Sequence, residues 1–274
     1  MATHLAAFFA NTFGTSLTEL AVVKDTILTP LSTTRFAVPP DYHNVRFMAA
    51  SGVNLSRAQI RTPTLQVRRI SGEIFPRKFG AGTFTLTNLE YERPPSPLSL
   101  TATEDFEILT SDTGGVNAVL YALVALAPDV VNLPPAGDVR IVRATATATL
   151  AQGVWTLTTP VPDFALEPGQ YTLIGFVPIS ASAVAARAVI TGQVYRPGVL
   201  GLAGTEQAAS DFDNNAFTAD PITSLIGYDM GSFNHLNFPQ FEFLANAADV
   251  SETVYLYVVR IGPALGVTTT PAGP

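Results

Sequence analysis

One stretch of the sequence occurs twice, and this repeat constrains the fold more than any other feature. Residues 106–128, FEILTSDTGGVNAVLYALVALAP, and residues 241–263, FEFLANAADVSETVYLYVVRIGP, have the same length and overlay without a gap. The matched positions are an aromatic–acidic pair at the start of each copy and valines in its second half: Phe106, Glu107, Val119 and Val124 in the first, Phe241, Glu242, Val254 and Val259 in the second. Each copy reads as a short strand, a polar turn and a long apolar strand, a pattern typical of a β-hairpin.

Shorter blocks upstream of these copies repeat in the same order. The pairs are residues 26–30 with 156–160, 36–40 with 164–168, Arg57 to Ile60 with Arg187 to Ile190, and Arg61 to Leu65 with Arg196 to Leu200. Blocks that keep their order over the whole chain predict an internal duplication. Because the repeat is far longer than the 20–50 residues of a solenoid unit, each copy is expected to be a whole domain.

The residues between the repeated blocks predict an all-β chain. β-Branched and aromatic residues come in short runs separated by Pro- and Gly-containing turns. Residues 64–70, 83–89 and 139–150 alternate apolar with polar side chains, as half-buried strands do. Strands at regular spacing indicate two tandem sandwiches or barrels, with jelly rolls among the options. The expected parts are an N-terminal arm (1–22), a first domain (23–131), a Pro-rich linker (132–138), a second domain (139–264) and a flexible tail (265–274).

The N-terminal arm has near-helical spacing of its apolar residues, which are Leu5, Phe9, Phe13, Leu17 and Leu20. This spacing predicts a short amphipathic helix that packs on another surface. That surface is either the arm's own domain or, alternatively, a neighbouring subunit or an enclosed membrane. No basic residue of the arm supports a contact with lipid.

Composition excludes several classes of function. The net charge is −7 and the lysines are Lys24 and Lys78 alone, so the basic face of a nucleic-acid-binding domain is not expected. The absence of cysteine excludes disulfides and thiolate metal sites. No window of about 20 uninterrupted apolar residues indicates a membrane span.

Candidate chemistry is sparse, and we expect no catalytic, cofactor-binding or metal-binding residues and no enzyme activity. His4, His43 and His235 lack the spacing of metal ligands. Residues 211–215 resemble the start of a calcium loop, but Ala216 and Ile222 stand where Gly and Glu are required, so a polar loop is favoured.

Two pairs of charged residues recur in both copies and are predicted to have structural roles. Glu107 and Glu242 occupy the same place in both copies, which favours a structural role over an active site. Arg57 and Arg187 share an Arg-Ala-x-Ile block, which suggests an arginine at a strand edge or a subunit contact, where its guanidinium holds carboxylates or carbonyls.

The repeated 106–128 and 241–263 segments, the two Arg-Ala-x-Ile blocks and the run LEPGQY from Leu166 to Tyr171 carry a resemblance. In architecture the whole chain resembles the double jelly-roll major capsid proteins of tailless icosahedral viruses. That resemblance implies two tandem jelly rolls, pseudo-hexagonal homotrimers and a place in the virion shell. Expected partners are further copies of the chain, minor capsid proteins and a genome or internal membrane beneath the shell, without sequence-specific nucleic-acid binding. Candidate subunit contacts are Leu5, Phe9, Phe13, Arg57 and Arg187.

Two other functions stay open from the sequence. A non-catalytic tandem sandwich for binding or adhesion would place a ligand groove in the loops of residues 202–237. A jelly-roll carbohydrate-active enzyme would bring paired carboxylates into one cleft.

Overall fold

The computed structural model of the 274-residue chain describes most of its strands and their connections. The described residues are 4–10, 15–23, 33–52, 55–69, 73–74, 77–78, 91–92, 98–101, 103–112, 120–129, 133, 135–180, 182–200, 202–203, 229–245, 248 and 251–263. Among them the chain is all-β, as predicted, with four sheets and one short helix, α1 (Pro63–Arg68).

Two sheets come from the strands up to Ala127, which we call the first unit. One sheet has the order β10 (Leu98–Ser99), β5 (Asn44–Gly52), β12 (Leu120–Ala127), β1 (His4–Ala10) and β3 (Ala21–Val22), and β8 (Arg77–Lys78) and β9 (Tyr91–Glu92) also pair with β5. The other has the order β2 (Thr18–Glu19), β11 (Asp105–Asp112), β6 (Leu55–Arg61) and β7 (Glu73–Ile74), and β4 (Phe36–Ala37) also pairs with β11.

Two further sheets come from the strands after Val139, which we call the second unit. One has the order β15 (Val161–Pro162), β13 (Val139–Thr147), β22 (Ser251–Gly262), β16 (Gln170–Ser180) and β19 (Leu202–Ala203), and β20 (Gly231–Asn234) also pairs with β16. The other has the order β14 (Trp155–Thr158), β21 (Gln240–Ala245), β17 (Ala183–Val189) and β18 (Gly198–Leu200).

The two units share one strand order. The path β1-β12-β5 of the first unit corresponds to β13-β22-β16 of the second, with β10 and β20 each pairing with the last strand. Likewise β2-β11-β6-β7 corresponds to β14-β21-β17-β18. In each unit the last two long strands therefore lie in different sheets, next to the unit's first and second strands. Each unit is a pair of facing sheets, as in a β-sandwich.

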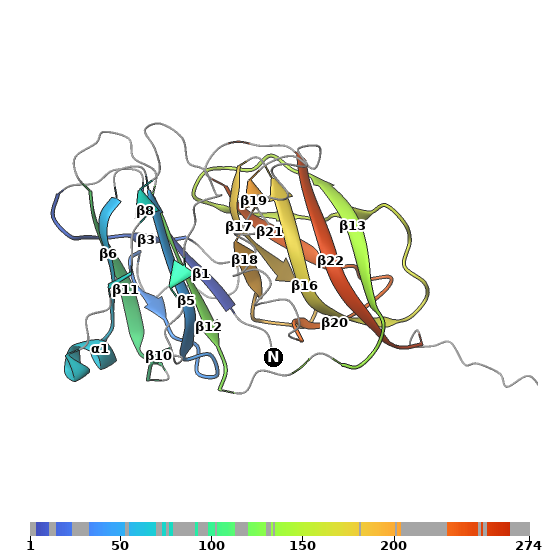
Figure 1. The fold of residues 1–274 in the computed structure, drawn as a ribbon, viewed down its shortest axis with the longest axis horizontal. Coiled ribbons are helices and arrows are strands. Elements are labelled where there is room, and N and C mark those ends of the chain that lie inside the picture. The colour runs from blue at the N-terminus through green and yellow to red at the C-terminus, as the bar shows by residue number, and fades with distance from the viewer. Residues whose placement is uncertain are drawn as a thin grey trace, which may run out of the picture.

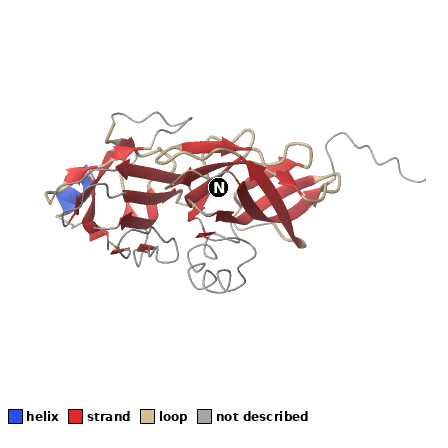
Figure 2. Ribbon diagram, turned by 90° about the horizontal axis from the view of Figure 1, so that it is seen from above, coloured by secondary structure: helices blue, strands red, loops and turns tan. Residues whose placement is uncertain are grey.

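The units stand side by side with their long strands running in a similar direction (Figure 1), and Figure 2 shows the same arrangement from above. β1 and β12 lie on the side of the first unit that faces the second. Both faces of these strands are buried. Ala6, Phe8 and Val124 pack into the first core, whereas Leu5 and Tyr121 pack into a cluster with the second unit.

The prediction of a helix near the N-terminus is wrong. Residues 4–10 form β1, a central strand that pairs with β12 and β3, so they belong to the first unit and are not a separate arm. The spacing of Leu5 and Phe9 does not distinguish a helix from a strand, because a step of four residues returns to the same face in both. Phe13 lies outside the described residues.

The prediction of two β-hairpins is also wrong. β11 pairs with strands of one sheet and β12 with strands of the other, and the same division separates β21 from β22. The gapless overlay fails in the second strand of each copy. Core residues of β12 include Ala122 and Val124, and core residues of β22 include Val254 and Leu256. Even-numbered residues therefore face the core in both strands, whereas the overlay matches even-numbered residues of one strand with odd-numbered residues of the other.

The strand predicted over residues 64–70 is largely helix α1 instead. Thr62 caps it by accepting a hydrogen bond from the Leu65 amide at 3.1 Å, and Pro63 occupies its first turn, where a missing N–H is tolerated. The strand predicted over 139–150 is confirmed by β13, and residues 83–89 lie outside the described part. The proposed linker and domain limits stay predictions.

Replacing Val254 with Asp should prevent soluble folding. Val254 is fully buried in the second core, and an unpaired carboxylate there should cost more than about 4 kcal/mol. Thr253→Asp is the matched control, because Thr253 is half-buried on the opposite face of the same strand. The measurement is the soluble fraction and circular dichroism of both variants. A folded Val254→Asp protein would contradict the inward orientation of this residue.

Candidate functional site

The described residues make their most extensive buried polar contacts where the two units meet, a region we call the junction. Its first-unit members are His4, Leu5 and Tyr121, and its second-unit members are Gly153, Arg187, Arg196, Glu242 and Ala245.

A buried ion pair lies at the centre of the junction. Arg187 of β17 and Glu242 of β21 are directly opposite each other in register, and each is 1% exposed. Arg187 Nε donates to Glu242 Oε2 at 2.8 Å, and its guanidinium lies 4.1 Å from the Trp155 ring centroid. Arg187 Nη1 also donates to the Leu5 carbonyl of β1 at 3.1 Å. The arginine therefore joins its own sheet to a strand of the other unit.

The backbone continues this connection. The Leu5 amide donates to the Arg196 carbonyl at 3.1 Å, and the Arg196 amide donates to His4 Nδ1 at 3.1 Å. Gly198 permits the close approach, because a Cβ at this position would lie 2.5 Å from Leu5 Cβ. β1 is thus bonded to β12 on one edge, and at Leu5 its other edge bonds the segment before β18.

Tyr121 forms a second polar contact across the junction. Its hydroxyl donates to the Ala245 carbonyl and accepts from the Gly153 amide at 3.1 Å. Burial raises the pKa of Tyr121, so the phenol stays protonated and able to donate. Phe9 lies beside it, with ring centroids 5.1 Å apart, and also contacts Gly153.

Aromatic rings close the junction near His4. Tyr42 of the first unit stacks on Tyr195 of the second with centroids 3.7 Å apart. Burial raises the pKa of both phenols, which therefore remain neutral. His4 stacks on Phe36 and meets the edge of Tyr195, at centroid distances of 6.0 Å and 6.1 Å.

These contacts make the junction a mechanical connection. Ion pair, backbone bonds and aromatic stacking all fix β1 and β12 against the second unit, and the apolar cluster around them includes side chains of both units. Within the described residues no group of three or more His, Asp or Glu side chains could hold a metal ion. No described helix is both long and apolar enough to span a membrane.

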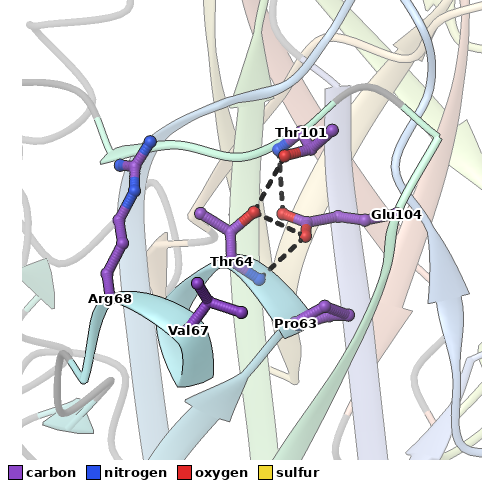
Figure 3. Close-up of a pocket in the computed structure, with 6 residues that line it drawn as sticks. All are labelled: Pro63, Thr64, Val67, Arg68, Thr101 and Glu104. Atoms are coloured by element: carbon purple, nitrogen blue, oxygen red, sulfur yellow. Dashed lines mark hydrogen bonds between the residues drawn. The ribbon is translucent and has the colours of Figure 1, made fainter.

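A surface hollow of about 430 Å³ lies beside helix α1 (Figure 3). Glu104 is its acidic residue, and both of its carboxylate oxygens are already used. Oε2 accepts from the Thr64 amide and hydroxyl at 3.1 Å and 2.8 Å, and Oε1 accepts from the Thr101 amide at 2.9 Å. Glu104 therefore acts as a second cap for the start of α1.

The structure separates the predicted subunit contacts. Leu5 and Arg187 touch each other inside the chain, so neither side chain is accessible to a second subunit, and this part of the prediction is wrong. Phe9 is partly buried in the junction. Arg57 is exposed on β6, and Phe13 lies outside the described residues. The possible calcium loop, residues 211–215, is also outside them.

The predicted match between Arg57 and Arg187 is wrong. Glu107 lies opposite Arg61 and Glu242 lies opposite Arg187, so Arg61 rather than Arg57 is the counterpart of Arg187. In the first unit Arg61 bonds Glu107 and also Glu19, at 2.8 Å, and Arg35 approaches Glu107 at 2.9 Å. The matched glutamates identify Arg61 as the counterpart of Arg187 only when the strand register is known.

The two ion pairs should differ in their contribution to stability. Arg187→Ala leaves Glu242 buried without its main partner and should lower the free energy of unfolding by about 3–5 kcal/mol. Arg61→Ala is the matched control; its side chain is 37% exposed, so a loss below about 1 kcal/mol is expected. Urea denaturation measures both. Equal losses would contradict the assignment of the junction as the more desolvated site.

Comparisons with known proteins do not assign this chain to a family. No protein-family profile and no curated protein matches the sequence. Among solved structures, the major capsid protein P2 of bacteriophage PM2 is similar at 11% sequence identity, over 94% of this chain and 98% of that one. The TM-score of 0.24 shows that the two chains superpose poorly despite this extent.

Proposed function

We propose that this chain is a structural subunit of the major capsid type, which assembles with copies of itself into a closed shell and performs no turnover. The observation that carries the proposal is the strand order shared by the two units. In each unit one sheet runs from the first strand (β1 or β13) through the last (β12 or β22) to β5 or β16, and the other sheet has the order β2-β11-β6-β7 or β14-β21-β17-β18. We infer from this order that each unit is a jelly roll, a fold that capsid subunits share with lectins and cupins.

The shared order also supports the duplication. Two unrelated sandwiches would rarely place every corresponding strand in the same neighbourhood, and both units carry an arginine–glutamate pair at the same register position of the same sheet. We infer that the chain consists of two tandem jelly rolls that descend from one.

The junction supports a mechanical role. A subunit that transmits load within a shell needs its two domains fixed relative to each other, whereas ordinary interdomain contacts permit motion. Here β1 and β12 have one face in each core, and an ion pair is desolvated between the units. Two jelly rolls held in this way form one block with strands running in a similar direction (Figure 1).

Location and partners follow from the proposal. Three such chains would supply six similar units, which suits a homotrimer with a pseudo-hexagonal outline in an icosahedral lattice. The chain would lie in the virion, with minor capsid proteins at special positions and a genome or internal membrane beneath it.

Native mass measurement and negative-stain electron microscopy of the purified protein test this function. We expect a trimer and, at higher concentration, hexagonal blocks or closed shells. A protein that stays monomeric up to high concentration would refute the proposal. A stable small oligomer that captures sugars on a glycan array, without forming shells, would instead favour the adhesion module.

A further inference from the structure

The junction is built from two faces, and each has a counterpart that the single chain leaves partly exposed. The first unit contributes the outer face of β1 and β12, and the second contributes the outer face of β17 and β21. Because the units share a strand order, the second unit has an equivalent β13–β22 face and the first an equivalent β6–β11 face.

The β13–β22 face matches the β1–β12 face position for position. On the first unit Tyr121 pairs with Phe9. On the second unit Tyr255 pairs with Arg143. Placing Tyr121 on Tyr255 puts Leu5 on Val139 and Ala7 on Ile141, and all of these side chains point away from their own core. The exposure differs sharply: Leu5 and Ala7 are 1% and 2% exposed, whereas Val139 and Ile141 are 55% and 62% exposed.

The β6–β11 face matches the β17–β21 face in the same way. Glu107 and Arg61 stand opposite each other as Glu242 and Arg187 do. Leu109 lies between Gln59 and Glu19, just as Leu244 lies between Ala185 and Trp155. In the second unit Arg187, Glu242 and Leu244 are at most 1% exposed. On the first unit Glu107 and Leu109 are each 6% exposed, and Arg61 and Glu19 beside them are 37% and 38% exposed.

We propose that the β13–β22 face of one copy of this chain binds the β6–β11 face of another, repeating the junction between molecules. Ile141 would occupy the place that Ala7 has in the junction, and Arg61 would donate to the main-chain carbonyl of Val139, as Arg187 does to that of Leu5. The contact is heterologous, because the two surfaces are different, and such contacts generate rings or open filaments.

Ion pairs flank the central positions of both faces. On the β13–β22 face Arg143 Nη1 donates to both carboxylate oxygens of Asp163, at 2.8 Å and 2.9 Å. On the β6–β11 face Glu19 pairs with Arg61 at 2.8 Å. Exposed charged pairs of this kind are typical of the polar rim of a protein interface.

The inference rests on the proposed function and specifies its subunit contact. If each contact repeats the relation between the units of one chain, closure after three chains requires a turn of about one sixth of a circle per unit. Other rotations would give a different ring or a filament with the same contact.

Two variants block one face each. Ile141→Asp places a carboxylate on the β13–β22 face, and Gln59→Arg places a long cation where the junction has the fully buried Ala185. Each should leave the melting temperature near the wild-type value and raise the dissociation constant of self-association at least about thirtyfold, as for loss of a central contact. Val67→Asp is the matched control; Val67 is 83% exposed on α1, outside both faces, and its variant should assemble as wild type.

Mixing the two variants separates this contact from a symmetric one. Each variant alone should be monomeric, but Ile141→Asp retains its β6–β11 face and Gln59→Arg retains its β13–β22 face. Sedimentation velocity of an equimolar mixture should therefore show a one-to-one heterodimer that grows no further. A monomer peak alone in the mixture, or wild-type assembly by Ile141→Asp, would overturn the inference.

The outcomes distinguish the inference from the function. If Ile141→Asp still forms shells like the wild type, the proposed function as a shell subunit stands and the proposed contact is wrong. If the mixture gives a heterodimer but the wild-type protein forms only small rings or filaments, the proposed contact stands and the proposed function is wrong.

Discussion

The structure depends on the burial of β1 on both of its faces. A central strand normally gives one face to its own core and the other to solvent or a helix. β1 instead gives Ala6 and Phe8 to the first core and Leu5 to the second, and the Leu5 carbonyl accepts a hydrogen bond from the fully desolvated Arg187. The Arg187–Glu242 pair is stable in this low-dielectric place because its hydrogen bonds are largely satisfied from both units. The two units therefore share one apolar core at the junction.

The two faces that meet in the junction are different from each other. The second unit contributes Arg187 on its β17–β21 sheet, and β1 of the first unit covers this arginine. The same arginine–glutamate arrangement recurs on the first unit, where Arg61 and Glu107 carry no covering strand among the described residues. The duplication proposed above would account for this repetition, because a copied domain carries the same binding surface as the original.

The sequence predicted the class of fold and some of its strands, but not their partners. β-Branched runs and the alternation over β13 indicated strands because burial on one face sets a period of two. The segment at Leu5 and Phe9 could not be resolved, because a spacing of four fits a helix and a strand alike and only pairing with β12 decides between them. Helix α1 was missed because a local cap, Thr62 followed by Pro63, outweighed the alternation after it.

The ion-pair site was half predicted. Glu107 and Glu242 were matched as structural residues, and both hold an arginine of the neighbouring strand. Arg57 was matched in place of Arg61 because sequence similarity shows the order of residues but not the strand register. The register depends on pairing between segments that are distant in the sequence. The same limit explains why Leu5 and Arg187 were assigned to contacts between subunits when they contact each other.

The position of β1 also affects the order in which the contacts of the protein can form. β1 is synthesised before the second unit, and the Arg187 that bonds its Leu5 carbonyl lies 182 residues later in the chain. Contacts over such separations carry a high entropic cost of closure and slow the folding of β-rich domains. Until the second unit is complete, an apolar strand with two faces to bury has only one available, which exposes a surface prone to misassembly. The most N-terminal described residues of this chain are therefore among the last to reach their final environment.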